Sequence, residues 1–178
     1  MRVDNATIAD TVAGLAAGHV RSVEPIAGGD ICAAHRVRLA DGRIVFAKSR
    51  PGSPPRFFAV EAAGLTRLAM VEGGVPVPSV IAYDSSCLVL EWVEPGLPTA
   101  SAAEQLGRSL ARTHCAGAEV FGSAEGDGWI GDLILPGGPW DTWVDLWVDG
   151  RVLPFLQAAA DRHALRPDDA RDIERVLT

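Results

Sequence analysis

The stretch IVFAKSRPGSPPRFFAVEAAGL, residues 44–65, indicates the fold of this chain, because it joins a strand ending in lysine to a helix that carries glutamate. Alternate side chains of a strand share a face, so Lys48 is predicted to lie on the same face as Ile44 and Phe46. A cation on an apolar strand face is costly unless it meets an anion. We therefore expect Glu61, on the following helix, to pair with Lys48 and fix its position.

Lys48 is the only lysine of the chain, and arginine fills every other basic position apart from histidine. Lysine and arginine are not interchangeable where a compact point charge must fit an anion. A lysine at the end of a strand is ordinarily an edge residue whose head reaches water. Its being the sole lysine favours the other interpretation, a cation that contacts phosphate groups.

The patterns around this stretch predict two parts, residues 1–94 and 95–178, joined by the linker Pro95-Gly96-Leu97-Pro98. In the first part we expect five strands and two helices, namely strands at 22–26, 31–39, 43–48, 80–83 and 87–93 and helices at 7–17 and 57–70. In the second part we expect helices at 101–116, at 140–163 with a kink at Pro154, and from Pro167 onward, with a loop over 117–139. The predicted fold class is α+β: an antiparallel sheet with one inserted helix, followed by a helical half.

Two further segments sit where a nucleotide site would need them. Gly28, Gly29 and Asp30 form a turn between the first two strands, and glycines there let backbone amides approach phosphates. By itself, however, such a turn is an ordinary connection. Residues 91–93, Glu-Trp-Val, end the last strand just before the linker, where a kinase hinge presents backbone groups to adenine; the alternative is a strand end whose aromatic ring covers the core.

The ordered set of segments resembles the fructosamine (ketosamine) kinases, a family in the protein-kinase-like group with the aminoglycoside and choline kinases. The segments that carry the resemblance are residues 28–31, 46–48, 57–65, 75–78, 88–91, 106–114, 129–131 and 143–154. The resemblance implies ATP-dependent phosphorylation of the sugar 3-hydroxyl of ketosamines, such as fructosamines on protein lysines, with ATP and Mg²⁺ as cofactors. It also implies roles for the residues named above. Lys48, held by Glu61, would contact the ATP phosphates, Gly28, Gly29 and Asp30 would cover them, and Glu91, Trp92 and Val93 would bracket adenine.

The chain departs from the family pattern in one respect. The family's catalytic segment, His-Gly-Asp-Leu-Trp-x-Gly-Asn, and the later metal-binding Asp do not occur in the sequence. The nearest match, Ile130-Gly131-Asp132-Leu133, lacks the His, and no Asn follows it because Asn5 is the only Asn. We interpret Asp132 as a loop residue. We expect no catalytic residue and no metal ligand in this chain, place both beyond Thr178, and expect a truncated chain that is inactive alone.

Other side chains are expected to be structural. His114 falls on the apolar face of a predicted helix and is interpreted as a core residue, and the Trp140, Trp143 and Trp147 stripe is interpreted as core packing. Cys32, beside the glycine turn, could sense oxidation, but a buried and inert thiol is the preferred interpretation.

Composition limits the remaining classes of function. The net charge of −7 argues against nucleic acid or a membrane surface as the main partner. The three unpatterned cysteines and the absence of a signal-peptide pattern predict a cytoplasmic protein. Two alternatives stay open: a non-catalytic nucleotide-binding or interaction module, and a kinase of another small molecule such as an aminoglycoside. Self-association through the helical half is a further expectation.

Overall fold

The computed structural model describes residues 4–123 and 125–177. The chain divides into two compact units, one ending at Gly117 and the other beginning at Ala118. Each unit has its own sheet and helices.

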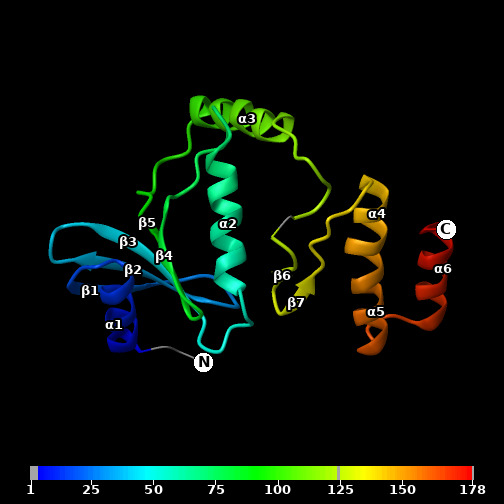
Figure 1. Ribbon diagram of the computed structural model, residues 1–178, viewed down its shortest axis with the longest axis horizontal. Helices are drawn as coiled ribbons and strands as arrows, with labels where there is room; N and C mark the ends of the chain where they lie inside the picture. The colour runs from blue at the N-terminus through cyan, green and yellow to red at the C-terminus, as the bar shows by residue number, and fades with distance from the viewer. Residues whose placement is uncertain (1–3, 124, 178) are drawn as a thin grey trace. The chain divides into compact units, whose positions relative to one another are not determined.

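The first unit is built on a five-stranded sheet with the strand order β1-β2-β3-β5-β4 (Figure 1). Its strands are β1 Val20–Ile26, β2 Ala33–Leu39, β3 Ile44–Ser49, β4 Val80–Tyr83 and β5 Cys87–Glu91. Every neighbouring pair is antiparallel. The predicted five-stranded antiparallel sheet is therefore confirmed, although β2 begins at Ala33, after the expected Ile31, and β5 ends at Glu91, before the expected Val93.

Two helices cover opposite faces of this sheet, because alternate residues of β3 and β5 belong to different clusters. Helix α1, Asn5–Leu15, packs with the cluster that holds Val45 and Val89. Helix α2, Phe57–Ala69, packs with the cluster that holds Leu88 and Leu90. The inserted helix is thus confirmed, and its packing assigns the face of Leu88 to α2.

Replacing Gly64 by alanine is expected to stabilise the protein. Gly64 lies inside α2, and a Cβ built there meets no atom within 4 Å. Because glycine loses more backbone freedom on folding than alanine, Gly64→Ala should raise the free energy of unfolding by about 0.5–1 kcal/mol. The measurement is urea unfolding followed by circular dichroism.

Gly42→Ala is the matched control, since its Cβ would also meet nothing within 4 Å, but its φ is +92°. The two glycines therefore have similar free space but different backbone conformations. Because alanine adopts a positive φ only at an energetic cost, Gly42→Ala should destabilise the protein. A shift of both variants in the same direction would show that free space, and not backbone conformation, decides the effect.

Helix α3, Ala100–Cys115, belongs to the first unit. The Thr113 hydroxyl accepts a hydrogen bond of 2.9 Å from the Val75 backbone N–H, which ties the helix to the connector after α2. The helix begins one residue before the expected residue 101, because Thr99 caps it: Thr99 has extended backbone dihedrals, and its hydroxyl accepts from the Ala102 N–H at 3.1 Å. The division into lobes at residues 94 and 95 stays a prediction.

The second unit contains a hairpin where the sequence predicts only a loop. Strands β6, Gly128–Ile130, and β7, Leu133–Leu135, pair antiparallel, and Phe121 forms an isolated bridge with Trp140. The prediction of a loop over residues 117–139 is therefore wrong. The two strands are short, and the glycine-rich sequence around them obscures their apolar pattern. Asp132 lies in the turn between the two strands, which confirms its interpretation as a loop residue.

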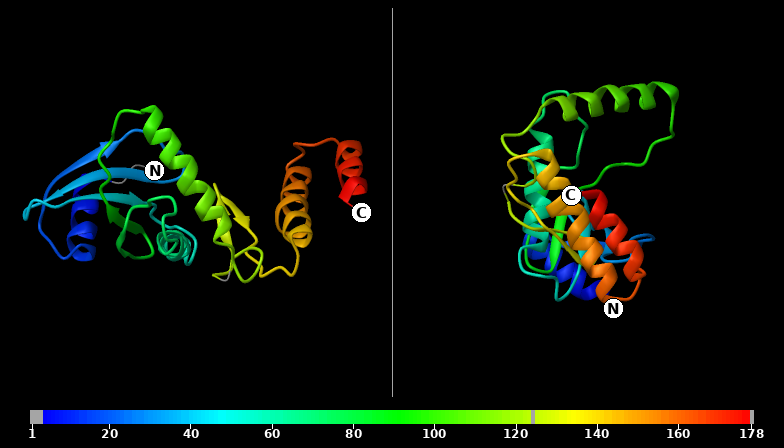
Figure 2. Two further views of the ribbon diagram at one scale, coloured as in Figure 1. Left: turned by 90° about the horizontal axis from the view of Figure 1, so that it is seen from above. Right: turned by 90° about the vertical axis from the view of Figure 1, so that its right-hand side faces the viewer.

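The long helix predicted over 140–163 is three consecutive elements, which form one rod in Figure 1: α4, Trp143–Trp147; a π-helical turn, Val148–Val152; and α5, Leu153–Asp161. The rod begins after Trp140 because Thr142 and Asp145 form a capping box. A π turn precedes Pro154, and the kink at this proline stays a prediction. Proline has no N–H to donate, and the Gly150 carbonyl accepts from the Arg151 guanidinium at 2.8 Å. Helix α6, Pro167–Leu177, runs beside α5 (Figure 2).

Several aromatic and helical side chains are more exposed than the sequence predicts. Trp143 and Trp147 are 54% and 50% exposed, with their rings stacked 5.5 Å apart. His114 is also exposed, and α3 contributes no buried residue. The core assignments of these three residues are wrong for the described chain, because helical spacing shows which residues share a face but not whether that face is covered.

Among the described residues, no helix has the length and apolarity needed to cross a membrane.

Candidate functional site

The predicted partnership of Lys48 and Glu61 is present at the junction of β3 and α2. The Lys48 Nζ donates to both carboxylate oxygens of Glu61, at 2.8 Å to Oε1 and 2.9 Å to Oε2. The two side chains are 29% and 32% exposed. A pair this exposed contributes little to stability, so its main effect is to hold the ammonium group in one place.

Local packing explains why these two side chains meet. In β3, Val45, Ala47 and Ser49 are buried on the α1 side, which leaves Lys48 on the opposite face. In α2, Glu61 follows the buried Phe58 by one helical turn, and side chains three apart on a helix are neighbours. Burial of Phe58 therefore turns Glu61 toward the sheet.

An apolar cavity of about 210 Å³ lies on the same face, at the end of β5. Its lining residues are Phe46, Pro78, Leu90, Glu91, Trp92 and Val93. Phe46 precedes Lys48 by two residues, which in a strand is a distance of roughly 6.6 Å along the chain. A flat apolar group in this cavity could therefore carry a negatively charged tail toward the Lys48 ammonium.

The three residues predicted to bracket adenine thus lie together on the wall of this cavity. The Glu91 carboxylate accepts from the Ser79 hydroxyl at 2.8 Å, and the Glu91 N–H donates to the Ser79 carbonyl at 2.9 Å. These bonds hold the connector before β4 against the strand end. Because β5 ends at Glu91, the backbone of Trp92 and Val93 is outside the sheet ladder.

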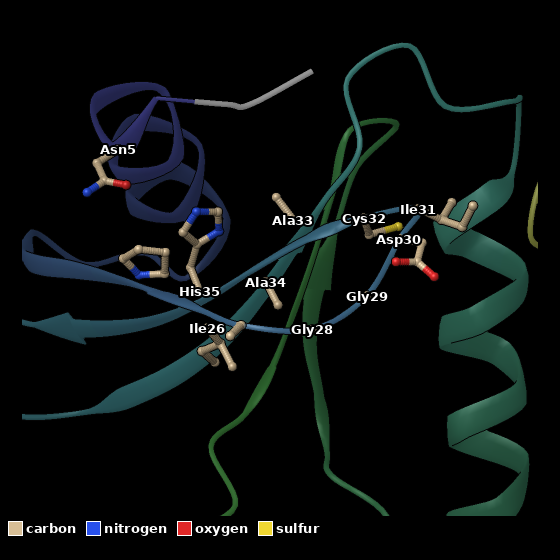
Figure 3. A pocket seen from close by; sticks show the side chains of 12 residues that line it. Asn5, Ile26, Gly28, Gly29, Asp30, Ile31, Cys32, Ala33, Ala34 and His35 are labelled. Carbon is tan, nitrogen blue, oxygen red and sulfur yellow. The ribbon is translucent and has the colours of Figure 1, made fainter.

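The glycine turn forms the wall of a second and larger cavity, of about 680 Å³ (Figure 3). Gly28, Gly29 and Asp30 all line it and are exposed. In Figure 3 the side chains of Asp30 and Cys32 lie toward α2. Gly28 and Gly29 have φ of +114° and +85°, conformations that residues with a Cβ rarely adopt. The turn therefore requires glycine and leaves its backbone open to a ligand.

Cys32 is half-buried close to the ion pair. Burial raises the pKa of its thiol; the Lys48 and Arg50 cations oppose this rise, and the Glu61 carboxylate adds to it. A raised pKa favours the unreactive thiol over the thiolate. Burial raises the pKa of Cys87 much further, to about 12.

The three cysteines should consequently react with iodoacetamide in a fixed order at pH 8. Cys115 is exposed, Cys32 is half-buried and Cys87 is 1% exposed, so we expect Cys115 to be alkylated first and Cys87 last. The measurement is peptide mass spectrometry over a time course, with chain denatured in urea as the control in which all three react. Labelling of Cys87 as fast as Cys115 in the folded chain would contradict the assigned burial.

Across residues 4–123 and 125–177, no three His, Cys, Asp or Glu side chains lie close enough together to hold a metal ion. The placement of the Mg²⁺ ligands beyond Thr178 stays a prediction.

Nearly the whole chain is similar to known proteins. The family model of the fructosamine kinases matches residues 5–177. The chain belongs to the fructosamine kinase family. Two curated relatives carry the name probable ketoamine kinase. The one from Thermus thermophilus is 39% identical over 139 residues, covering 78% of this chain and 48% of its own. The one from Synechocystis is 32% identical over 144 residues, with the same coverage of 78% and 48%.

A solved structure shows the same fold. A fructosamine-3-kinase candidate from Thermobifida fusca is 40% identical and superposes with a TM-score of 0.86, over 96% of this chain and 60% of its own. This similarity confirms the predicted α+β, kinase-like architecture. The chain spans about half the length of the curated relatives that it matches.

Two residues that line the apolar cavity of this fructosamine kinase family member are not predicted as site residues from the sequence. The strand pattern predicts Phe46 on the face of Lys48 but not in a cavity, and Pro78 enters the sequence analysis only within residues 75–78 of the family resemblance. The position of Phe46 two residues before Lys48 is the signal that could have identified it. No signal in the sequence pairs Arg36 with Trp92, whose ring centroid lies 5.2 Å from the Arg36 guanidinium carbon.

Proposed function

We propose that this chain carries the nucleotide-binding part of a fructosamine kinase, which transfers phosphate from ATP to a ketosamine. The observation that supports it most is the Lys48–Glu61 pair, with bonds of 2.8 and 2.9 Å, on the same strand face as the apolar cavity at the end of β5. A fixed cation beside an apolar slot suits a nucleotide, which joins a flat base to a charged phosphate chain.

In this proposal each predicted residue has a separate role. Lys48 binds the phosphates and Glu61 holds it. The turn of Gly28, Gly29 and Asp30 covers the phosphates, and residues 91–93 form the wall against adenine. Mg²⁺, when bound, would supply charge neutralisation on the phosphates in addition to the positive charge of Lys48.

The ketosamine substrate is proposed from the family and from the names of the two curated relatives. Because the sequence lacks a His-Gly-Asp segment followed by Asn, we place the catalytic base and the metal ligands outside this chain. The chain should accordingly bind ATP without transferring its phosphate.

Calorimetry and a turnover assay test this proposal together. ATP with Mg²⁺ should bind more tightly than adenosine or inorganic triphosphate, because ATP alone reaches both the cavity and Lys48. No phosphorylated fructosyl-lysine should form. Failure of ATP to bind would overturn the nucleotide-binding role, and product formation would overturn the assignment of the catalytic residues.

A non-catalytic nucleotide-binding module is the second candidate, favoured by the same missing segment. The two candidates differ in what the gene encodes downstream of the Thr178 codon. An in-frame His-Gly-Asp with a later Asn would support the kinase, and an immediate stop codon would support the module.

A further inference from the structure

Arg36 connects the first strands of the sheet to the segment that follows β5. It lies in β2, opposite Glu24 of β1 and Phe46 of β3. Its Nη1 lies 3.4 Å from Glu24 Oε2, and its Nη2 lies 3.9 Å from Glu94 Oε1. Its guanidinium carbon lies 5.2 Å from the centroid of the Trp92 ring.

The segment that Arg36 contacts lies just beyond the end of the sheet. Trp92 and Glu94 follow the last ladder residue of β5, so no sheet hydrogen bond fixes them. The Trp92 Nε1 is buried without a hydrogen-bond partner among the described residues. The indole is therefore positioned by ring contacts, and the Arg36 side chain, 22% exposed, supplies one of them.

The same ring forms part of the apolar cavity. Trp92 lines it together with Phe46, the β3 residue directly opposite Arg36. The Arg36 guanidinium lies over the Trp92 ring, and Arg36 is paired across the sheet with Phe46, so this one residue connects two walls of the cavity. The exposed ion pairs to Glu24 and Glu94 are weak singly, but they orient the guanidinium on the ring.

We propose that Arg36 is a positioning residue for the nucleotide base, acting through Trp92. This proposal rests on the proposed function, since it assigns adenine to the cavity of about 210 Å³. In this proposal Arg36 acts on the cavity wall that contacts the base, and Lys48 contacts the phosphates. The two residues therefore affect the binding of different parts of the ligand. Loss of Arg36 lowers the affinity for every ligand that carries adenine and leaves the affinity for phosphate groups unchanged.

Arg36→Met tests the proposal, because methionine keeps an apolar stem and removes the planar cation. Affinities are measured by displacement of a fluorescent ATP analogue with ATP, adenosine and inorganic triphosphate. Dissociation constants for ATP and adenosine should both rise about three- to tenfold, the range expected for loss of one cation–π contact, while that for triphosphate stays unchanged. Trp92 emission, obtained as the difference from Trp92→Phe, should shift to longer wavelength without any ligand.

Two further variants separate positioning from general stability. Arg38→Met is the matched control on the same strand and face, and no ion pair or ring contact of Arg38 occurs within the described ranges; it should bind all three ligands as wild type does. Trp92→Leu should reproduce the adenine-specific loss even where Arg36→Met folds poorly. Arg36→Lys, which retains charge without the planar fork, should restore part of the affinity.

The outcomes distinguish this proposal from the proposed function. If the wild-type chain binds ATP, and Arg36→Met and Trp92→Leu leave the adenosine affinity unchanged, the role of Arg36 is overturned and the proposed function stands. An equal loss for triphosphate also overturns it, because the effect would then not be specific to the base. Wild-type chain that does not bind ATP overturns both.

Discussion

Lys48→Ala lowers the affinity of the chain for ATP by about ten- to 100-fold, the loss expected when a charged hydrogen bond to phosphate is removed. The Lys48 ammonium is held by two bonds to Glu61, at 2.8 and 2.9 Å, and is 29% exposed, so a ligand can reach it. No other lysine of the chain can replace it. Adenosine has no phosphate, so its affinity should not change.

Calorimetry with ATP and adenosine separates this effect from unfolding. The folded state should change little, since a pair with members 29% and 32% exposed contributes at most about 1 kcal/mol. Glu61→Gln is the informative companion: it keeps Lys48 but loosens its position, and should reduce ATP affinity less than Lys48→Ala. ATP binding by Lys48→Ala at wild-type strength would refute the phosphate role of this residue.

Phe58→Ala should lower the free energy of unfolding of the first unit by about 3–5 kcal/mol, the usual cost of truncating a buried phenylalanine. Phe58 is 1% exposed and belongs to the cluster of Ala62, Leu88 and Leu90. Its ring also meets that of Phe57 edge to face, with centroids 5.1 Å apart. Truncation would remove the largest fully buried side chain of this cluster, which joins α2 to β5.

Urea unfolding followed by circular dichroism measures this loss. Leu68→Ala is the matched control on the same helix, because Leu68 is 41% exposed and should change the free energy of unfolding by no more than about 0.5 kcal/mol. Since Glu61 lies one turn after Phe58, Phe58→Ala should also weaken ATP binding at urea concentrations where the chain is still folded. Equal stability of the two variants would mean that α2 is not anchored by Phe58.

Much of the first unit could be predicted because its signals are local. The alternation of residues 44–48 predicts the face of Lys48 correctly, and the sequence pattern predicts the helix over residues 57–69 to within one residue. The second unit was predicted less well. The β6–β7 hairpin occupies three residues per strand, too few to show alternation, and the π turn depends on how the Gly150 carbonyl is satisfied.

Helical spacing could not predict which side chains are exposed to solvent. Trp143, Trp147 and His114 lie on faces with apolar neighbours, yet all three are exposed in the described chain. A periodic pattern identifies residues that share a face, but burial requires another element to cover that face.

The sequence by itself determined the strand–helix order, the shared face of Lys48 and Phe46, and the pairing of Lys48 with Glu61, because each follows from periodicity within a short stretch or between two consecutive elements. Only the tertiary structure decided the apolar cavity, the stacking of Arg36 on Trp92, and the tie between Thr113 and Val75. These contacts join residues distant in sequence, and they depend on strand register and on the path of the chain after β5. Periodicity carries no information about either. The sequence could therefore predict the cation and residues 91–93, but not that Phe46 and Pro78 line the same cavity or that Arg36 contacts Trp92.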